Sequence, residues 1–174
     1  GEHTRRVGRL SAAIAQELGL GPDEVTLIQQ VAPLHDVGKI GIPDDILLCP
    51  NQLTPEQVQV MRSHTEIGGN LMAGSGIPLL DMAEEIARTH HERWDGSGYP
   101  AGLSGKEIPI AGRIVAVADS YDAVTHRRPY KPAWTAEEAW WEIARKAGAD
   151  FDPDVIDAFT EVLRSTGLNL EAPS

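Results

Sequence analysis

Apolar residues recur at helical spacing along most of the chain, and glycines and prolines separate one stripe from the next. The first stripe consists of Val7, Leu10, Ile14 and Leu18, and it ends at Gly19. No stretch alternates convincingly between apolar and polar residues over four or more positions, as a half-buried strand would. The pattern therefore predicts an all-α fold.

Helix start signals divide the rest of the chain. Thr54 with Gln57, and Thr135 with Glu138, have the spacing of capping boxes. Further helices are expected to begin near Pro22, Pro78 and Asp152. One more helix is implied by an apolar stripe made of Ile114, Val117, Ala118, Tyr121 and Val124.

Breakers in the sequence predict where these helices end. The helix from Pro22 should be interrupted near Pro33, because proline lacks the backbone donor. The helix from Thr54 should continue to Gly74. The segment after Lys39 and residues 94–108 are rich in glycine and proline, so both are predicted to be loops.

The length of 174 residues suits one domain with a single core. With 15 Lys and Arg against 26 Asp and Glu, the net charge is −11, which argues against a protein that binds nucleic acid polymers. The longest nearly apolar run, residues 71–80, is too short to span a bilayer, so no membrane contact is expected. The single cysteine, Cys49, excludes an internal disulfide and favours a reducing, cytoplasmic location.

The chain starts at Gly1 without a methionine, so we expect a fragment of a longer protein. Residues 1–167 are predicted to form the domain, and residues 168–174 are expected to be a frayed tail.

Histidines and aspartates indicate a metal site. His35 precedes Asp36 directly, His90 precedes His91 directly, and His64 lies on a helix between these pairs. Imidazoles and carboxylates from several helices suit first-row divalent ions in a bundle core. Because adjacent helical residues point about 100° apart, each pair reaches two neighbouring ions more easily than one.

Other polar residues carry weaker signals. Asp119 lies in an apolar run, where a buried carboxylate needs a partner such as a cation. The sequence leaves open whether His3 is a ligand, and His126, in a basic segment, is not expected to be one. Asp95 and Asp122 are equally well explained as a turn residue and a solvated helix residue.

Three longer motifs resemble the HD-GYP family of the HD phosphohydrolase superfamily. They are HDVGK at residues 35–39, HHERWDGSGYPAGLSG at residues 90–105, and IPIAGRIVAVADSYDAVT at residues 108–125, which RPYK follows at residues 128–131. The resemblance covers nearly the whole chain. It implies an HD-type helical bundle with a glycine-rich GYP loop, and a bacterial phosphodiesterase that opens cyclic di-GMP to linear pGpG and sometimes to GMP.

The same resemblance implies roles for individual residues. The implied metal ligands are His35, Asp36, His64, His90, His91 and Asp119, with His3 as a further candidate. Asp36 would bridge two divalent ions, usually iron and sometimes manganese, and Lys39 would contact the scissile phosphate. Tyr99, Arg128 and Lys131 would contact the substrate. Glu92 either orients a ligand imidazole or lies on the surface.

The sequence departs from the family pattern in ways that affect these expectations. The glutamate that binds a third ion in some members would precede Gly1, so two ions are favoured. Arg127 stands where an aspartate is common, and Thr65 stands where proline often follows the middle histidine. Family members also combine with upstream receiver or sensor domains in two-component systems, contact diguanylate cyclases, and dimerise through helices that precede this region.

Two alternatives to this function remain. The domain could be a non-catalytic module that responds to a cyclic dinucleotide or binds a protein, although the retained motifs argue against it. It could also hydrolyse a different cyclic dinucleotide, because these residues do not distinguish guanine from adenine.

Overall fold

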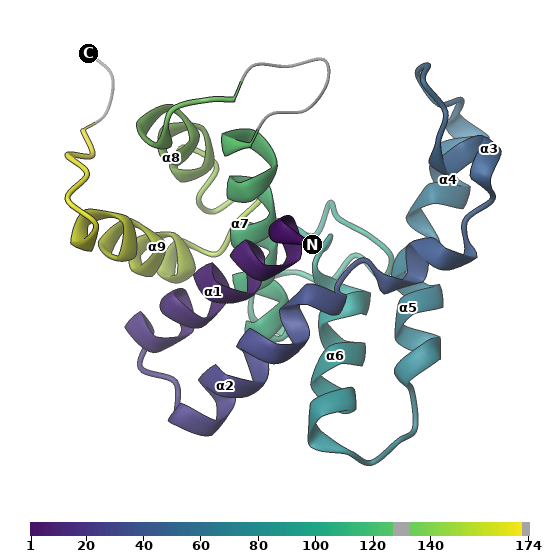
Figure 1. The fold of residues 1–174 in the computed structure, drawn as a ribbon, viewed down its shortest axis with the longest axis horizontal. Coiled ribbons are helices and arrows are strands. Elements are labelled where there is room, and N and C mark those ends of the chain that lie inside the picture. The colour runs from purple at the N-terminus through teal and green to yellow at the C-terminus, as the bar shows by residue number, and fades with distance from the viewer. Residues whose placement is uncertain (127–132, 172–174) are drawn as a thin grey trace.

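The computed structural model describes residues 1–126 and 133–171, and within these ranges it contains α- and 3-10 helices but no strand (Figure 1). The elements are α1 (Glu2–Glu17), α2 (Pro22–Val31), η1 (Ala32–Leu34), η2 (Val37–Gly41), α3 (Asp44–Leu47), α4 (Pro55–Arg62), α5 (His64–Met72), α6 (Pro78–Thr89), η3 (Gly105–Glu107), α7 (Ile110–Thr125), α8 (Ala136–Ala144) and α9 (Pro153–Ser165). The all-α prediction is confirmed.

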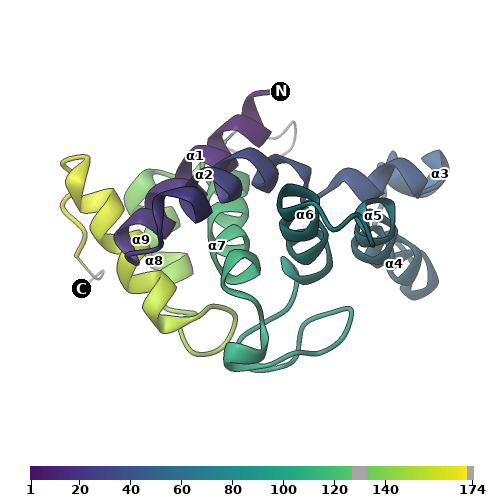
Figure 2. The same ribbon diagram turned by 90° about the horizontal axis from the view of Figure 1, so that it is seen from below.

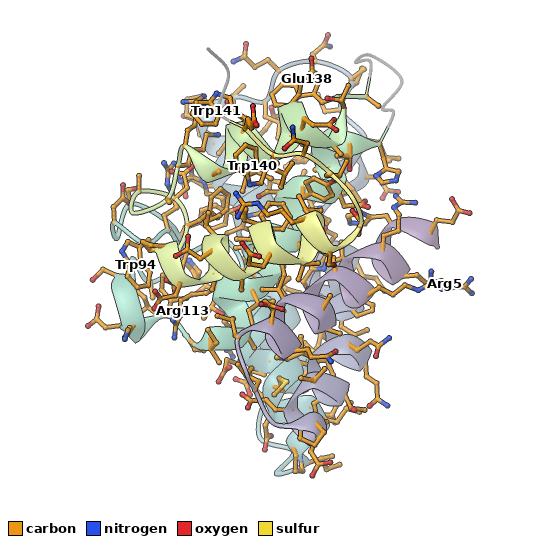
Figure 3. The ribbon with its side chains drawn as sticks, turned by 90° about the vertical axis from the view of Figure 1, so that its left-hand side faces the viewer. Arg5, Trp94, Arg113, Glu138, Trp140 and Trp141 are labelled. Carbon is orange, nitrogen blue, oxygen red and sulfur yellow. The ribbon has the colours of Figure 1, made fainter. Side chains whose placement is uncertain are left out.

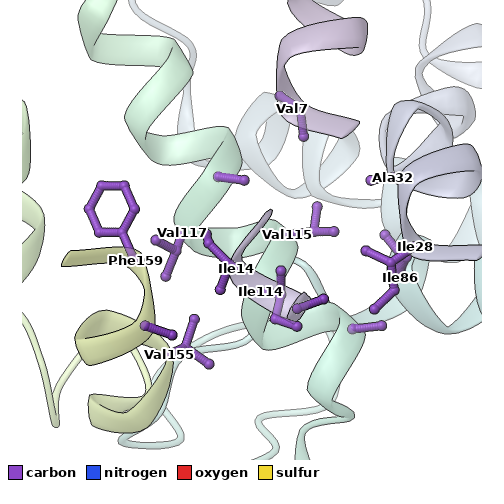
Figure 4. Packing of buried hydrophobic residues seen from close by; sticks show 14 of the residues in the cluster. Val7, Ile14, Ile28, Ala32, Ile86, Ile114, Val115, Val117, Val155 and Phe159 are labelled. Atoms are coloured by element: carbon purple, nitrogen blue, oxygen red, sulfur yellow. The ribbon is translucent and has the colours of Figure 1, made fainter. Parts of the chain in front are cut away.

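Helix α7 is the centre of the molecule and packs against α1, α6, α8 and α9. Its residues Ile114, Val115 and Val117 are fully buried, and the α9 residue Phe159 is buried beside them (Figure 4). α1 packs against α2 and α5 against α6, while α3 and α4 extend away from α8 and α9 (Figures 1 and 2). One continuous core therefore supports a projecting α3–α4 arm.

Helix α8 is fixed to α9 by a tryptophan. Trp140 is 8 % exposed and its side chain lies between the two helices (Figure 3). Its indole N–H donates to the Thr160 hydroxyl at 2.9 Å, so the one polar atom of this ring is satisfied within the core.

Several predicted helix ends are confirmed. Both capping boxes form, at Thr54 before α4 and at Thr135 before α8. α2 ends at Val31 and gives way to η1 around Pro33, as the missing backbone donor requires.

Two predictions of local structure are wrong. The helix expected from Thr54 to Gly74 is divided at Ser63 into α4 and α5. There the hydroxyls of Ser63 and Thr65 donate to carbonyls three residues earlier, at 2.6 and 3.0 Å, and such bonds compete with the helical ladder. The segment after Lys39 is also not a plain loop, because it contains η2 and α3.

The predicted frayed tail is packed over part of its length. Leu168 contacts the core, and Leu170 is 5 % exposed and belongs to it. Packing of these two leucines against the core extends the folded region past residue 167. None of the helices in the described ranges combines the length and apolar character needed to cross a bilayer.

Candidate metal centre

Three imidazoles are oriented by backbone carbonyl oxygens that lie three or four residues earlier in the chain. The Nδ1 atoms of His35, His64 and His90 lie 2.7, 2.7 and 3.0 Å from the carbonyl oxygens of Ala32, Met61 and Ile86. Because a carbonyl only accepts, Nδ1 carries a hydrogen in each ring, and Nε2 has a lone pair for a cation whenever the ring is neutral. Three Nε2 atoms are thereby directed away from the backbone.

These rings join carboxylates in two sets, each with one ligand atom per residue and all such atoms within 4.8 Å of one another. The first ligand group consists of Asp36, His64, His90 and His91. The second ligand group consists of His3, His35 and Asp119.

Asp36 faces both ligand groups. Its Oδ1 lies 3.2 Å from His64 Nε2, and its Oδ2 lies 3.4 Å from His35 Nε2. In the second ligand group, Asp119 Oδ1 is 3.5 Å from both His35 Nε2 and His3 Nε2. One carboxylate thus lies between the donor atoms of the two groups.

The two adjacent pairs behave differently. His35 and Asp36 divide between the ligand groups, but they lie in the turn between η1 and η2, so the 100° rotation along a helix is not the reason. His90 and His91 stay together, with ring centroids 4.1 Å apart, because α6 ends at Thr89 and His91 lies beyond the helix.

The donors fit divalent cations. His35 Nε2 and Asp36 Oδ1 are buried, and neither has a hydrogen-bond partner within the described ranges. Unsatisfied buried polar atoms are costly unless something pairs with them. A cation beside each would satisfy these atoms, and mixed imidazole and carboxylate donors suit first-row divalent metals.

The protonation states of the first ligand group favour metal binding. Burial, together with the neighbouring rings of His90 and His64, lowers the pKa of His91 to about 3. Burial also lowers the pKa of His90, so both rings are neutral near pH 7. Burial alone would raise the pKa of the Asp36 carboxyl, but the imidazoles around it, His35 foremost, lower that pKa and keep the group ionised.

The pKa of His35 shifts in the opposite direction to those of His90 and His91. Burial would lower its pKa, but the carboxylates of Asp119 and Asp36 outweigh burial and raise the pKa to about 10. A cation and a proton therefore compete for His35 Nε2, and metal binding there releases a proton.

Asp122 supports the second ligand group, and its interpretation as a solvated helix residue is wrong. The residue is 4 % exposed, and its Oδ2 lies 2.6 Å from His3 Nδ1. Arg6 donates to both carboxylate oxygens, at 2.5 and 3.0 Å. His126 lies outside both ligand groups, with Nδ1 3.2 Å from Asp122 Oδ1. Asp122 thus fixes the ring of His3 so that its other nitrogen faces Asp119.

Lys39 and Tyr99 lie at the edge of the centre. The Lys39 ammonium donates to Asp36 Oδ2 at 2.6 Å. The Tyr99 ring is stacked on His91, with centroids 4.8 Å apart and an interplanar angle of 18°. Burial raises the pKa of Tyr99 to about 12, so its phenol is neutral. Arg128 and Lys131 lie outside the described residues.

Glu92 stabilises the loop that carries Tyr99, a role that neither sequence interpretation predicted. Its carboxylate accepts the backbone N–H groups of Ala101 and Leu103 at 2.8 and 3.1 Å. The residue is 4 % exposed, so the loop closes over a buried charge that its own amides satisfy. A sequence signal for this contact is lacking, because the acceptor precedes its donors by nine and eleven residues.

Comparisons with known proteins agree with this geometry. A family model described as an HD domain matches residues 1–155. A protein of Thermotoga maritima named "Cyclic di-GMP phosphodiesterase" is 56 % identical over 160 residues, which are 92 % of this chain and 44 % of that protein. A "3'3'-cGAMP-specific phosphodiesterase 2" of Vibrio cholerae is 42 % identical over 161 residues, 92 % of this chain and 31 % of that protein. The chain therefore spans less than half the length of these relatives.

A solved structure shares the fold. Bd1817, described as an HDG"Y"P protein from Bdellovibrio bacteriovorus, superimposes with a TM-score of 0.71 at 22 % identity, over 93 % of this chain and 51 % of that one. This likeness confirms the predicted HD-type bundle. The chain belongs to the HD domain family and, through its HDVGK and GYP motifs, to the HD-GYP proteins within it.

Proposed function

We propose that this domain is a metal-dependent phosphodiesterase that hydrolyses cyclic di-GMP to linear pGpG, and in some family members on to GMP, which ends a second-messenger signal. The observation that carries the proposal is Asp36, whose two carboxylate oxygens face separate ligand groups. The 56 % identical relative named for this activity supports the choice of substrate.

Two divalent ions are the proposed cofactors, with iron first and manganese second. Asp36, His64, His90 and His91 would hold one ion, and His3, His35 and Asp119 would hold the other, with Asp36 shared. When bound, such ions activate water and neutralise phosphoryl oxygens. We do not include a third ion, because the described ranges contain two ligand groups.

The chain's own residues prepare the site for an anionic substrate. Lys39 lines a cavity of about 490 Å³ together with Asp36, Asp119 and Arg6. Its ammonium would donate to a non-bridging oxygen of the scissile phosphate and stabilise the charge that develops there. Arg128 and Lys131 are proposed to hold the second phosphate.

A second cavity meets the first one at the ligand groups. It has a volume of about 270 Å³, and Tyr99 lines it. His91 and Asp119 line both cavities. A substrate with two bases and two phosphates could therefore occupy both cavities while one phosphate lies at the ligand groups.

The remainder of the protein is proposed by family analogy. We expect a receiver or sensor domain upstream, a homodimer, contacts with diguanylate cyclases and a cytoplasmic location. The part of the relatives that this chain does not match, more than half of their length, leaves room for such domains.

The activity is tested on protein purified without air and loaded with iron or manganese. Cyclic di-GMP should disappear and linear pGpG should appear when the reaction is followed by chromatography, which also shows whether GMP follows. A fully metallated protein that binds cyclic di-GMP without forming product would instead be a non-catalytic module, and the proposal would fail.

Asp122→Ala tests the second ligand group. Loss of this carboxylate releases His3, so affinity for one of the two ions should fall about 10- to 100-fold, the usual effect of removing a group that orients a ligand. Metal titration should still show one tight ion, held by the first ligand group. Asp157→Ala, at an exposed position on α9, is the control and should keep both ions. Two tight ions in Asp122→Ala would contradict the role given to Asp122.

A further inference from the structure

Arg62 lies at the rim of the 270 Å³ cavity, and the metal chemistry does not use it. It is the last residue of α4, two positions before the first-group ligand His64. The Thr65 hydroxyl donates to the Arg62 carbonyl at 3.0 Å and fixes the backbone at this junction. The position of Arg62 is therefore tied to that of the ligand group.

The guanidinium of Arg62 lies over an aromatic ring of the GYP loop. Its Cζ is 4.7 Å from the centroid of Tyr99, within the range of a cation–π contact. Tyr99 in turn stacks on His91, and its backbone N–H donates to the His91 carbonyl at 3.2 Å. The flat guanidinium is thus layered onto a ring that rests against a metal ligand.

Within the described ranges, the Arg62 guanidinium makes no hydrogen bond and no ion pair, so its N–H donors are free. Several arginines of the same ranges are paired, for example Arg6 with Asp122, Arg93 with Asp150, and Arg113 with Asp152, whereas Arg62 combines a free guanidinium with a place on a cavity wall. Arg62 instead lines a cavity shared with Ser120 and Asp119. An arginine that is oriented but not paired can offer two parallel N–H groups to a planar acceptor pair.

We propose that Arg62 selects guanine over adenine in the cyclic dinucleotide, an inference that rests on the proposed function. Guanine presents two adjacent acceptors, O6 and N7, and a guanidinium bonds both at once. Adenine presents N7 beside the N6 amino donor, and arginine has no acceptor to meet it. One base of the substrate would lie against Arg62 while the adjoining phosphate reaches the ligand groups.

The experiment compares kcat/KM for cyclic di-GMP, 3'3'-cGAMP and cyclic di-AMP on the metal-loaded domain. Arg62→Lys keeps the positive charge but loses the planar fork, and Arg62→Gln loses both. Arg5→Gln, an exposed change of equal charge on α1, is the matched control (Figure 3). Metal content and circular dichroism establish that each variant is folded and loaded.

The wild type should prefer cyclic di-GMP to cyclic di-AMP, and Arg62→Lys should reduce that preference about 10- to 100-fold, the range of one bidentate arginine–guanine pair. The loss should appear mainly in KM, and Arg5→Gln should keep the wild-type ratio. An equal fall for all three substrates would identify Arg62 as a phosphate contact and overturn the inference, as would an unchanged ratio or a wild type without preference. A wild type that forms no product from any substrate would instead refute the proposed function.

Discussion

Asp36→Ala is expected to abolish turnover of cyclic di-GMP and to lower the metal content of the purified domain. Among the described residues, Asp36 has its two carboxylate oxygens toward donors of both ligand groups, so its loss would remove the proposed shared ligand. Removing a group that only orients a ligand costs about 10- to 100-fold in affinity or activity, and loss of a shared ligand should exceed about 100-fold. Metal analysis by mass spectrometry and product chromatography measure the two effects.

A second substitution separates ligand loss from misfolding. Asp36→Asn keeps the shape of the side chain and should also lose metal, because it removes the anionic charge shared by the two groups. Asp45→Ala changes an exposed aspartate on α3 and should retain wild-type metal and activity. Full metal content in Asp36→Ala would remove this residue from the ligand set and with it the bridging argument.

Gly38→Ala is expected to destabilise the domain and weaken metal binding. A Cβ at this position would lie 1.8 Å from the carbonyl oxygen of His64 and 2.4 Å from the backbone nitrogen of Gly68. Both contacts are with backbone, so η2 and α5 must separate. Overpacking of this kind costs about 1–3 kcal/mol, which corresponds to a fall in Tm of roughly 2–12 °C for a domain of this size.

The effect on metal follows from what the two elements carry. Asp36 directly precedes η2 and His64 begins α5, so their separation moves two donors of the first ligand group apart. Gly21→Ala is the control, because a Cβ there meets nothing within 4 Å and φ is −63°. A thermal melt in which both alanine variants match the wild type would refute the close approach of η2 and α5.

The sequence predicted those features that depend on neighbouring residues. The capping boxes at Thr54 and Thr135 are local, because each joins residues three positions apart. The stripe on α7 likewise predicted a buried helix, because one face of that helix is apolar along its whole length.

Features that depend on tertiary contacts were not predictable in the same way. The residues that Asp122 joins, His3 and Arg6, are more than a hundred positions away in the chain. The break at Ser63 depends on side-chain hydroxyls whose bonding competes with a helical pattern that otherwise continues. Residue type and spacing alone give no sign of either arrangement.

The hydrogen bonds from His35, His64 and His90 to backbone carbonyl oxygens lower the entropy cost of binding a metal ion. Each ring is anchored by a backbone carbonyl close to it in the chain, so the conformational entropy of ordering the ring is lost during folding and not when an ion binds. The imidazole donors are therefore positioned before an ion binds, so selection among ions depends mainly on their charge and softness. Exchange of one divalent ion for another would then leave the scaffold in place.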